Sequence, residues 1–158
     1  MKYLIIGGVA GGASAAARLR RLDEKAQIIL FEKGNYVSYA NCGLPYYIGG
    51  TIADRAKLFV QTAKGFHDRF NIDIRTEQEV IALHPDKKSI SVKELSSGNV
   101  YEESYDKLVL SPGAEPIKPN LPGINNEKIF TLRNVSDTDK IKMYINGHQP
   151  KKAVVIGG

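Results

Sequence analysis

Residues 2–22 read KYLIIGGVAGGASAAARLRRL, and the order of apolar, glycine and alanine residues in this stretch decides the fold. Residues 2–6 form an apolar run that ends at a glycine pair, which predicts a buried strand and a tight turn. Residues 12–22 are rich in alanine and carry their arginines late, which favours a helix packed closely on a sheet. Residues 27–32, QIILFE, predict a second strand, and the crossover rule makes the two strands parallel. We therefore expect an α/β, Rossmann-like domain with a parallel sheet.

The chain beyond this unit contains further strands and helices. Between residues 72 and 105 lie four short alternating segments, IDIRT, EVIALH, SISVKEL and NVYEESY, and turns separate the last three. This spacing predicts a β-meander. Residues 107–111 predict another buried strand, which a proline and a glycine stop. The remaining expected elements are helices, from Cys42 to about Ile48, from a Thr62 cap to about Phe70, and from Asp137 to Ile145 before Asn146 and Gly147.

The segment KKAVVIGG at residues 151–158 repeats the pattern of the opening strand and its glycine pair. We expect this segment to be the first strand and glycine turn of a second Rossmann-like domain, truncated there. Residues 1–150 then make one domain.

Composition narrows the classes of function. Hydrophobic residues make up 42% of the 158 residues and charged residues 25%, which suits one compact core. The net charge of +5 comes from scattered basic residues, so we expect an anionic small molecule as partner and no nucleic acid. We find no signal peptide and no apolar stretch of bilayer length, and a lone cysteine fits a reducing compartment. We expect a cytoplasmic protein with no membrane partner and no metal site.

The glycine turn at residues 7–12, GGVAGG, lies between the first strand and the helix, where helix N-terminal amides can hold a pyrophosphate. Val9 stands where the usual fingerprint has its second glycine. Glu32 ends the second strand, about twenty residues beyond the turn, where a carboxylate binds adenosine ribose hydroxyls. The alternative is a packing turn beside a surface glutamate. We favour the dinucleotide site because strand, glycines, helix, strand and acid occur in the right order.

The segment SYANCGLPYY at residues 38–47 contains the lone cysteine, Cys42. A cysteine at a helix start experiences partial positive charge, which favours the thiolate. An inert buried thiol is the alternative, but the flanking residues are polar. Tyr47 stands five positions after Cys42, where a dithiol flavoenzyme has its second cysteine. A single thiol can store electrons as a mixed disulfide, a persulfide or a sulfenic acid.

Five segments together carry a resemblance to a known family: GGVAGGASAAARLRRLD, ILFEK, SYANCGLPYYIGG, ESYDKLVLSPGA and FTLRN. Over essentially the whole chain they resemble the coenzyme A-disulfide reductases. These enzymes form part of the single-cysteine branch of the FAD-dependent pyridine nucleotide-disulfide oxidoreductases. The resemblance implies FAD as cofactor, NAD(P)H as co-substrate, CoA disulfide as substrate and a homodimer. It also implies that electrons pass from NAD(P)H through the flavin to a mixed disulfide between Cys42 and CoA.

The resemblance also assigns site residues, with Cys42 as the catalytic one. The FAD-binding positions it implies are Gly7, Gly8, Val9, Ala10, Gly11, Gly12, Glu32, Lys33, Val80, Ser111, Pro112 and Gly113. The CoA-binding positions are Ser14, Arg18, Arg21, Ser38 and Asn41. Phe70 stands where some relatives carry a basic residue, so one phosphate contact is absent or comes from a neighbour such as Arg69.

The resemblance further divides the chain into an FAD-binding portion at residues 1–150, with the redox cysteine, and the truncated start of an NAD(P)-binding domain at 151–158. We expect residues 1–158 alone to be inactive. Three alternatives remain open: an NADH oxidase, peroxidase or per/polysulfide reductase of the same branch, a non-catalytic nucleotide-binding module, and a cytosolic electron carrier.

Overall fold

The computed structural model describes residues 1–157 and divides the chain into two compact units, each built from two stretches of sequence. Unit 1 comprises Met1–Tyr39 and Phe59–Gly113, and unit 2 comprises Ala40–Leu58 and Ala114–Gly158. The elements of unit 1 are β1 (Lys2–Ile6), α1 (Gly11–Leu22), β2 (Gln27–Glu32), α3 (Ala63–Phe70), β3 (Asp73–Thr76), β4 (Gln78–His84), η3 (Pro85–Lys87), β5 (Ser89–Glu94), β6 (Val100–Ser104) and β7 (Lys107–Leu110). Those of unit 2 are η1 (Asn41–Gly43), α2 (Leu44–Ile48), η2 (Arg55–Leu58) and α4 (Val135–His148).

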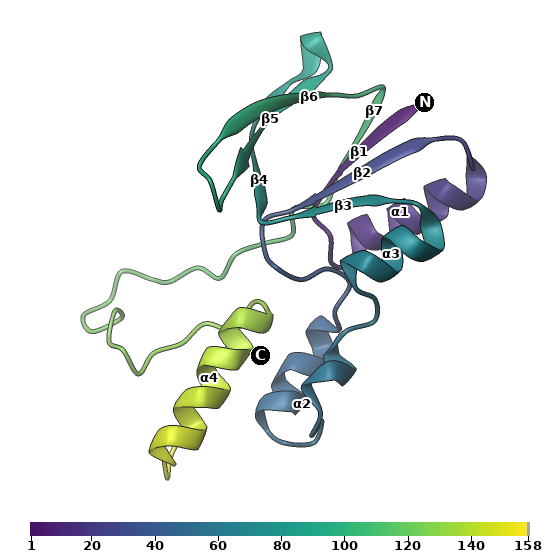
Figure 1. Ribbon diagram of the computed structural model, residues 1–158. Helices are drawn as coiled ribbons and strands as arrows, with labels where there is room; N and C mark the ends of the chain where they lie inside the picture. The colour runs from purple at the N-terminus through teal and green to yellow at the C-terminus, as the bar shows by residue number, and fades with distance from the viewer. Residues whose placement is uncertain (158) are drawn as a thin grey trace. The chain divides into compact units, whose positions relative to one another are not determined.

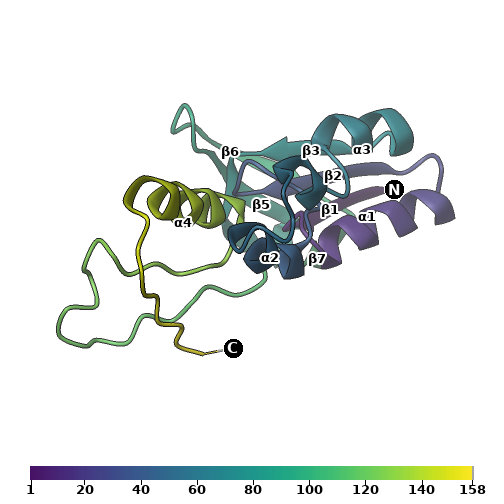
Figure 2. The same cartoon turned by 90° about the horizontal axis from the view of Figure 1, so that it is seen from below.

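Unit 1 is an α/β domain with a parallel sheet and a β-meander, as the sequence predicted, and its elements form three layers (Figure 1). Its parallel sheet has the strand order β3-β2-β1-β7, and its second sheet is the antiparallel meander β4-β5-β6. Helices α1 and α3 lie along one face of the parallel sheet, and the meander covers the other (Figures 1 and 2).

Alternation along the central strands builds two cores, one on each face of the parallel sheet. Ile5 and Leu30 pack with the alanines of α1 and with Phe66 of α3. Leu4 and Phe31 pack on the opposite face against the meander, among other fully buried residues. Each fully buried aliphatic or aromatic side chain contributes about 1.5–3 kcal/mol to stability. Burial of both faces explains why strands β1 and β2 read as continuous apolar runs.

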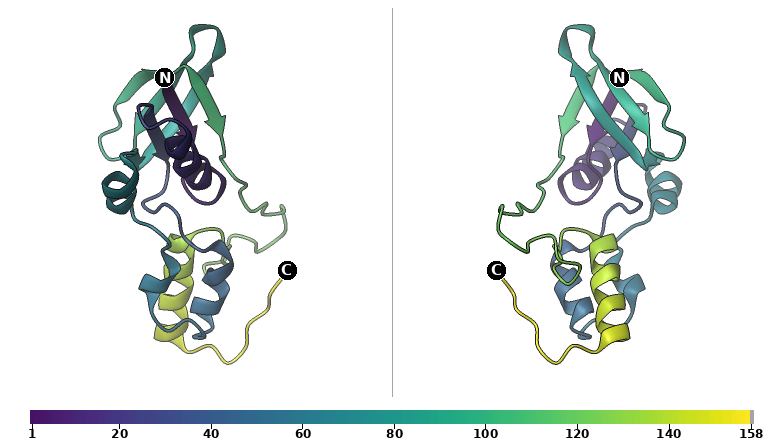
Figure 3. Two further views of the ribbon diagram at one scale, coloured as in Figure 1. Left: turned by 90° about the vertical axis from the view of Figure 1, so that its right-hand side faces the viewer. Right: turned by 90° about the vertical axis from the view of Figure 1, so that its left-hand side faces the viewer.

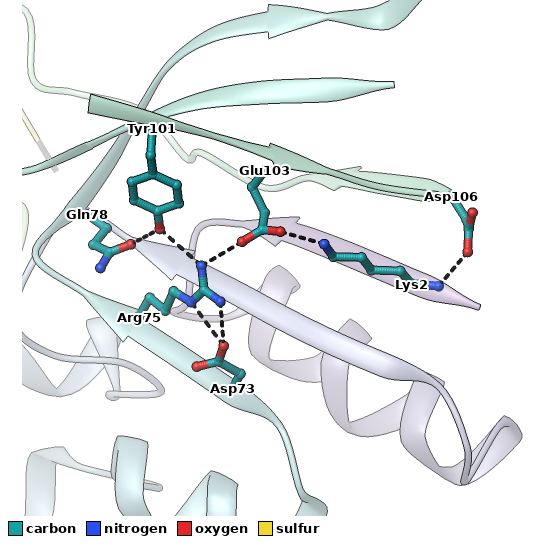
Figure 4. A network of polar contacts seen from close by, with 7 residues as sticks. All are labelled: Lys2, Asp73, Arg75, Gln78, Tyr101, Glu103 and Asp106. Carbon is teal, nitrogen blue, oxygen red and sulfur yellow. Dashed lines mark hydrogen bonds and ion pairs between the residues drawn. The ribbon is translucent and has the colours of Figure 1, made fainter. Parts of the chain in front are cut away.

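A polar network fastens the meander to the parallel sheet (Figure 4). Glu103 of β6 accepts hydrogen bonds from Lys2 of β1 and from Arg75 of β3, the latter at 2.8 Å. Arg75 also pairs with Asp73 and reaches the Tyr101 hydroxyl at 3.0 Å. Burial by itself would raise the pKa of Glu103, but the hydrogen bonds from Lys2 and Arg75 outweigh it and hold that pKa below its ordinary value.

Unit 2 is helical (Figure 3). Helix α4 packs beside α2, with Val135 and Thr138 fully buried. The Asn134 side chain caps the start of α4 by accepting from the Asp137 N–H at 2.9 Å.

Five sequence expectations differ from the structure. Strand β7, expected to be buried, is an edge strand of the described sheet, and its Leu110 is exposed. The segment IDIRT supplies β3, which pairs in parallel with β2, so the meander has only the other three strands. Helix α4 runs through Asn146 and Gly147, because the left-handed residue Gln149 ends it by donating to the Ile145 carbonyl. No α-helix begins at Cys42, since a 3₁₀ turn over 41–43 precedes α2 and Pro45 occupies the first turn of that helix. Residues 151–157 form no strand, because no neighbouring strand pairs with them among the described residues, and Gly158 lies outside these.

Candidate functional site

The turn between β1 and α1 has space only for glycine at its key positions. A Cβ atom at Gly12 would lie 1.8 Å from the carbonyl oxygen of Gly7, and one at Gly8 would lie 2.7 Å from a methyl group of Val37. Gly7 itself has a φ of +93°, and a Cβ there would lie 2.1 Å from the carbonyl oxygen of Ser111. Strand β1, helix α1 and the end of β7 therefore approach each other at backbone distance.

The N-terminus of α1 is open to an anion. Ala10 stands at the N-cap position and makes no side-chain hydrogen bond, and the first turn carries no acidic residue. The first N–H groups of a helix have no intrahelical acceptor, and the helix dipole adds partial positive charge there. A pyrophosphate group fits this donor set, which gives the glycine turn the chemistry expected of a dinucleotide site.

Glu32 lies against the same turn. Its Oε2 accepts a hydrogen bond from the Gly8 N–H at 2.7 Å, and its Oε1 accepts one from the Gly34 N–H at 2.8 Å. Each carboxylate oxygen can accept a further hydrogen bond, so the group can still bind ribose hydroxyls. The local fold thus orients Glu32 at the end of β2, where the sequence suggested it.

Ser111 completes the surroundings of the turn. Its N–H donates to the Ile6 carbonyl at 2.8 Å, and its Oγ lies 2.5 Å from the position of a Cβ built on Gly11. Pro112 and Gly113 follow it and are exposed. The other two expected FAD contacts lie toward the meander, where Lys33 pairs with Glu79 at 2.9 Å and Val80 packs on the buried residues of β5.

A pocket of about 480 Å³ opens beside α1 and α3 in unit 1. Two arginines, Arg21 and Arg69, line it, and so do the Ser14 and Ser38 side chains. Arg21 Nε donates to the Ala17 carbonyl at 3.1 Å. The full lining is Val9, Ala10, Ala13, Ser14, Ala17, Arg21, Ser38, Tyr39, Val60, Gln61, Phe66, Arg69 and Phe70. The mixture of arginine, hydroxyl and apolar groups suits a phosphorylated ligand with an apolar part.

The pocket unites three of the five expected CoA positions, Ser14, Arg21 and Ser38. Arg18 is exposed on α1 and is not among the described residues that line the pocket, and Asn41 belongs to unit 2. Sequence reasoning named Arg69 as a possible substitute but missed Tyr39 and Gln61. Tyr39 lies in the segment that carries Cys42 but received no role, Gln61 lies in no motif, and the tertiary fold brings both to the pocket.

Ser38 has a strained backbone, with a φ of +48°. Three hydrogen bonds hold it there: its N–H donates to the Gly8 carbonyl at 2.9 Å, and its carbonyl accepts from the N–H groups of Val60 and Gln61. Serine rarely adopts the left-handed region, and such strain concentrates at functional sites. In this backbone conformation Ser38 is hydrogen-bonded both to Gly8 of the glycine turn and to Val60 and Gln61, which line the pocket.

Cys42 is exposed in the 3₁₀ turn of unit 2, with the exposed Asn41 beside it. The turn is closed by the Gly43 N–H, which donates to the Ala40 carbonyl at 2.9 Å. This exposure contradicts the alternative of a buried, inert thiol. The sulfur is accessible to a disulfide in solution.

The described residues, 1–157, contain neither a membrane-spanning helix nor a cluster of metal-ligating side chains. No helix there combines the length and the apolar character needed to cross a membrane. No group of three histidine, cysteine, aspartate or glutamate side chains among those residues could hold a metal ion.

Comparison with known proteins gives close relatives. The chain is 44% identical to a coenzyme A disulfide reductase of Staphylococcus aureus (strain JH9), over 99% of this chain and 35% of the relative. It therefore spans about a third of the length of the curated relatives it matches.

Solved structures share the fold. A reduced CoADR-RHD protein of Bacillus anthracis is 55% identical, with a TM-score of 0.92 over 95% of this chain and 27% of that one. An NAD-dependent persulfide reductase from A. fulgidus is 37% identical, with a TM-score of 0.86 over 93% and 28% of the two chains. A water-forming NADH oxidase from Lactobacillus brevis is 27% identical, with a TM-score of 0.86 over 94% and 32%. The family model described as pyridine nucleotide-disulphide oxidoreductase matches residues 1–158, and the chain belongs to that family.

Proposed function

We propose that this chain provides the FAD- and CoA-binding part of an NAD(P)H-dependent oxidoreductase that reduces CoA disulfide through Cys42. The observation that carries the proposal is the pocket beside the glycine turn, which Arg21 and Arg69 line together with Ser14 and Ser38. CoA combines phosphate groups with a long arm of alkyl and amide groups, and this lining of arginine, hydroxyl and apolar side chains offers partners for both. The 44% identity to a coenzyme A disulfide reductase supports the same assignment.

The residues around the glycine turn fit the cofactor. The open N-terminus of α1 would hold the pyrophosphate, Glu32 would accept from ribose hydroxyls, and Ser111 would border the turn. Bound FAD would supply a pair of electrons that originates from NAD(P)H.

Cys42 would carry out the sulfur chemistry. Its thiolate attacks one sulfur of CoA disulfide, so that a bond forms between Cys42 and one CoA while the other CoA leaves as a thiolate. Two electrons then cleave this mixed disulfide and return the Cys42 thiolate and the second CoA thiolate. The exposure of the thiol in its turn supports this role.

The proposal extends to the context of the chain. Residues 1–150 would be the FAD-binding portion, and residues 151–158 would begin the NAD(P)-binding domain. The repetition of the opening strand-and-glycine pattern in residues 151–158 supports this division. We further propose that the protein is cytoplasmic, because a free cysteine suits a reducing compartment, and that it is a homodimer, as its resemblance to the coenzyme A-disulfide reductases implies.

A competition between two disulfides tests the proposal. The purified chain is incubated with equal amounts of CoA disulfide and glutathione disulfide, and intact mass identifies the adduct on Cys42. We expect the CoA adduct to exceed the glutathione adduct by about tenfold or more, since charged hydrogen bonds favour the phosphorylated ligand. The Cys42→Ser variant serves as control and should form neither adduct.

Equal adducts would remove the CoA assignment. A chain purified from cells with an added oxygen or sulfur atom on Cys42, and with no CoA preference, would instead favour an NADH oxidase or a persulfide reductase. Because the chain is similar to the persulfide reductase from A. fulgidus, a persulfide reductase is the main competing function.

A further inference from the structure

Helix α4 holds the segment that carries Cys42, although it lies far along the chain from it. Lys142 Nζ donates to the carbonyl oxygens of Tyr47 and Ile48, each at 3.0 Å. These two residues end α2, whose last carbonyls have no donor within the helix. The Tyr47 carbonyl also accepts from the Gly50 N–H at 3.2 Å, so the ammonium group adds a donor there, supplies one to Ile48 and complements the negative end of the helix.

A second contact reaches the other side of the same segment. Arg55 of η2 and Asp139 of α4 form a two-bond ion pair, with Nε to Oδ1 at 2.8 Å and Nη2 to Oδ2 at 2.7 Å. Paired bonds of this kind fix orientation as well as distance. Asp139 and Lys142 are three residues apart and so lie on one side of α4. The helix therefore fastens both α2 and η2.

The segment around Cys42 has its own apolar base in the buried Leu44 and Leu58, and the contacts from α4 add polar support to it. Helix α2 has only five residues, and isolated helices shorter than about 12–15 residues are marginal in water. The 3₁₀ turn over 41–43 leads directly into α2. The Ala40 N–H donates to the Leu58 carbonyl at 2.8 Å and closes the base of the segment. Between these ends, the polar anchors come from α4.

We propose that Lys142 and Asp139 are positioning residues for Cys42. Neither contacts the sulfur in the structure described above; they fix the helix and the turn on which the thiol is carried. One part of the inference, that Cys42 reacts with CoA disulfide, rests on the proposed function. Its conformational part, that α4 orders the segment 40–58, is independent of the substrate.

Three substitutions on α4 separate positioning from charge. Lys142→Met keeps the apolar stem and removes the donors, Lys142→Arg keeps donors for both carbonyls, and Lys140→Met removes an exposed lysine of the same helix as a matched control. Amide hydrogen exchange over residues 41–58 reports local order. Rate constants for Cys42 with CoA disulfide, and with a symmetrical aromatic disulfide of small size, report the use of the thiol.

We expect Lys142→Met to speed exchange over 41–58 by about tenfold, the effect of losing a hydrogen bond to a charged group. Its rate with CoA disulfide should fall by about tenfold or more, since small misplacements of reacting groups are costly. The rate with the small aromatic disulfide should stay within about threefold, because that reaction requires only an accessible thiol. Lys142→Arg should restore the behaviour of the unsubstituted chain, and Lys140→Met should not differ from it.

Unchanged exchange and an unchanged ratio of the two rates in Lys142→Met would overturn the proposal, as would failure of Lys142→Arg to restore them. If Lys142→Met does not fold, Asp139→Asn weakens only the ion pair with Arg55 and is judged by the same measurements. If even the unsubstituted chain shows no preference for CoA disulfide, the proposed function fails. The exchange data then decide whether α4 orders the Cys42 segment.

Discussion

Replacement of Gly12 by alanine tests the turn on which dinucleotide binding depends. The new Cβ atom would lie 1.8 Å from the oxygen and 3.0 Å from the carbon of the Gly7 carbonyl, whereas real Cβ atoms essentially never come within 3.0 Å of such atoms. Both contacts are with backbone, which cannot swing aside as a flexible side chain can. The turn between β1 and α1 must therefore open by roughly 1 Å, at the point where β7 also approaches it.

Two effects of opposite sign determine the stability of Gly12→Ala. Alanine in a helix is favoured over glycine by about 0.5–1 kcal/mol. Overpacking of a closely packed site costs about 1–3 kcal/mol, and a clash with two backbone atoms belongs at the upper end of that range. We expect a net loss of about 1–2 kcal/mol. With a urea dependence of about 2 kcal/mol per molar, the middle of the usual range, the unfolding midpoint should fall by roughly 0.5–1 M.

Gly147→Ala is the matched control. Gly147 also lies in a helix, but a Cβ built there meets no atom within 4 Å. Only the helix preference then acts, so the unfolding midpoint should rise. Urea titrations followed by far-ultraviolet circular dichroism measure both variants, and flavin fluorescence quenching measures FAD binding. A Gly12→Ala chain that matches the unsubstituted protein in midpoint and in FAD affinity would refute the argument from the turn.

Two other predictions concern charge. Because the pKa of Glu103 is depressed in the folded state, its contribution to stability is present above its unfolded pKa of about 4.3 and is lost as pH falls through the folded value. Glu103→Gln should therefore have a lower urea midpoint than the unsubstituted chain at neutral pH. The difference between the two midpoints should become smaller at about pH 3, and a difference that does not change with pH would contradict the argument. Arg69→Ala should reduce the preference of Cys42 for CoA disulfide over glutathione disulfide by about tenfold without changing FAD affinity. An unaltered preference would remove Arg69 from the ligand site.

The elements that the sequence predicted well are those fixed by local patterns. The unit from β1 to β2 was readable because the apolar runs, the glycines and the alanine-rich helix each carry their own signal. Thr62 was recognisable as a cap, and its hydroxyl does accept from the Gly65 N–H at 3.0 Å. Helix α4 was found, but its end was misplaced, because an exposed glycine near a helix end weakens the helix without stopping it.

The features that sequence reasoning missed depend on distant partners. Strand β3 looks like one more alternating segment, and only its pairing with β2 assigns it to the parallel sheet. The αL conformation of Ser38 follows from hydrogen bonds to Gly8, Val60 and Gln61, none of which a local pattern reveals. The same holds for the pocket, whose walls come from α1, α3 and the segments between. The roles of the individual site residues stay predictions, which the competition between disulfides and the Gly12→Ala and Arg69→Ala variants test.

The interleaving of the two units along the chain has a consequence for the order of folding. Arg55 must find Asp139 across 84 positions, and all of Phe59–Gly113 belongs to the other unit. The entropic cost of closing a flexible loop grows with its length. Once the α/β layers have formed, the antiparallel β-bridge between Tyr39 and Phe59 already holds the two ends of the segment Ala40–Leu58 close together. During synthesis the thiol-bearing segment emerges long before α4 does, so it acquires the support of α4 only after residues 135–148 have been made.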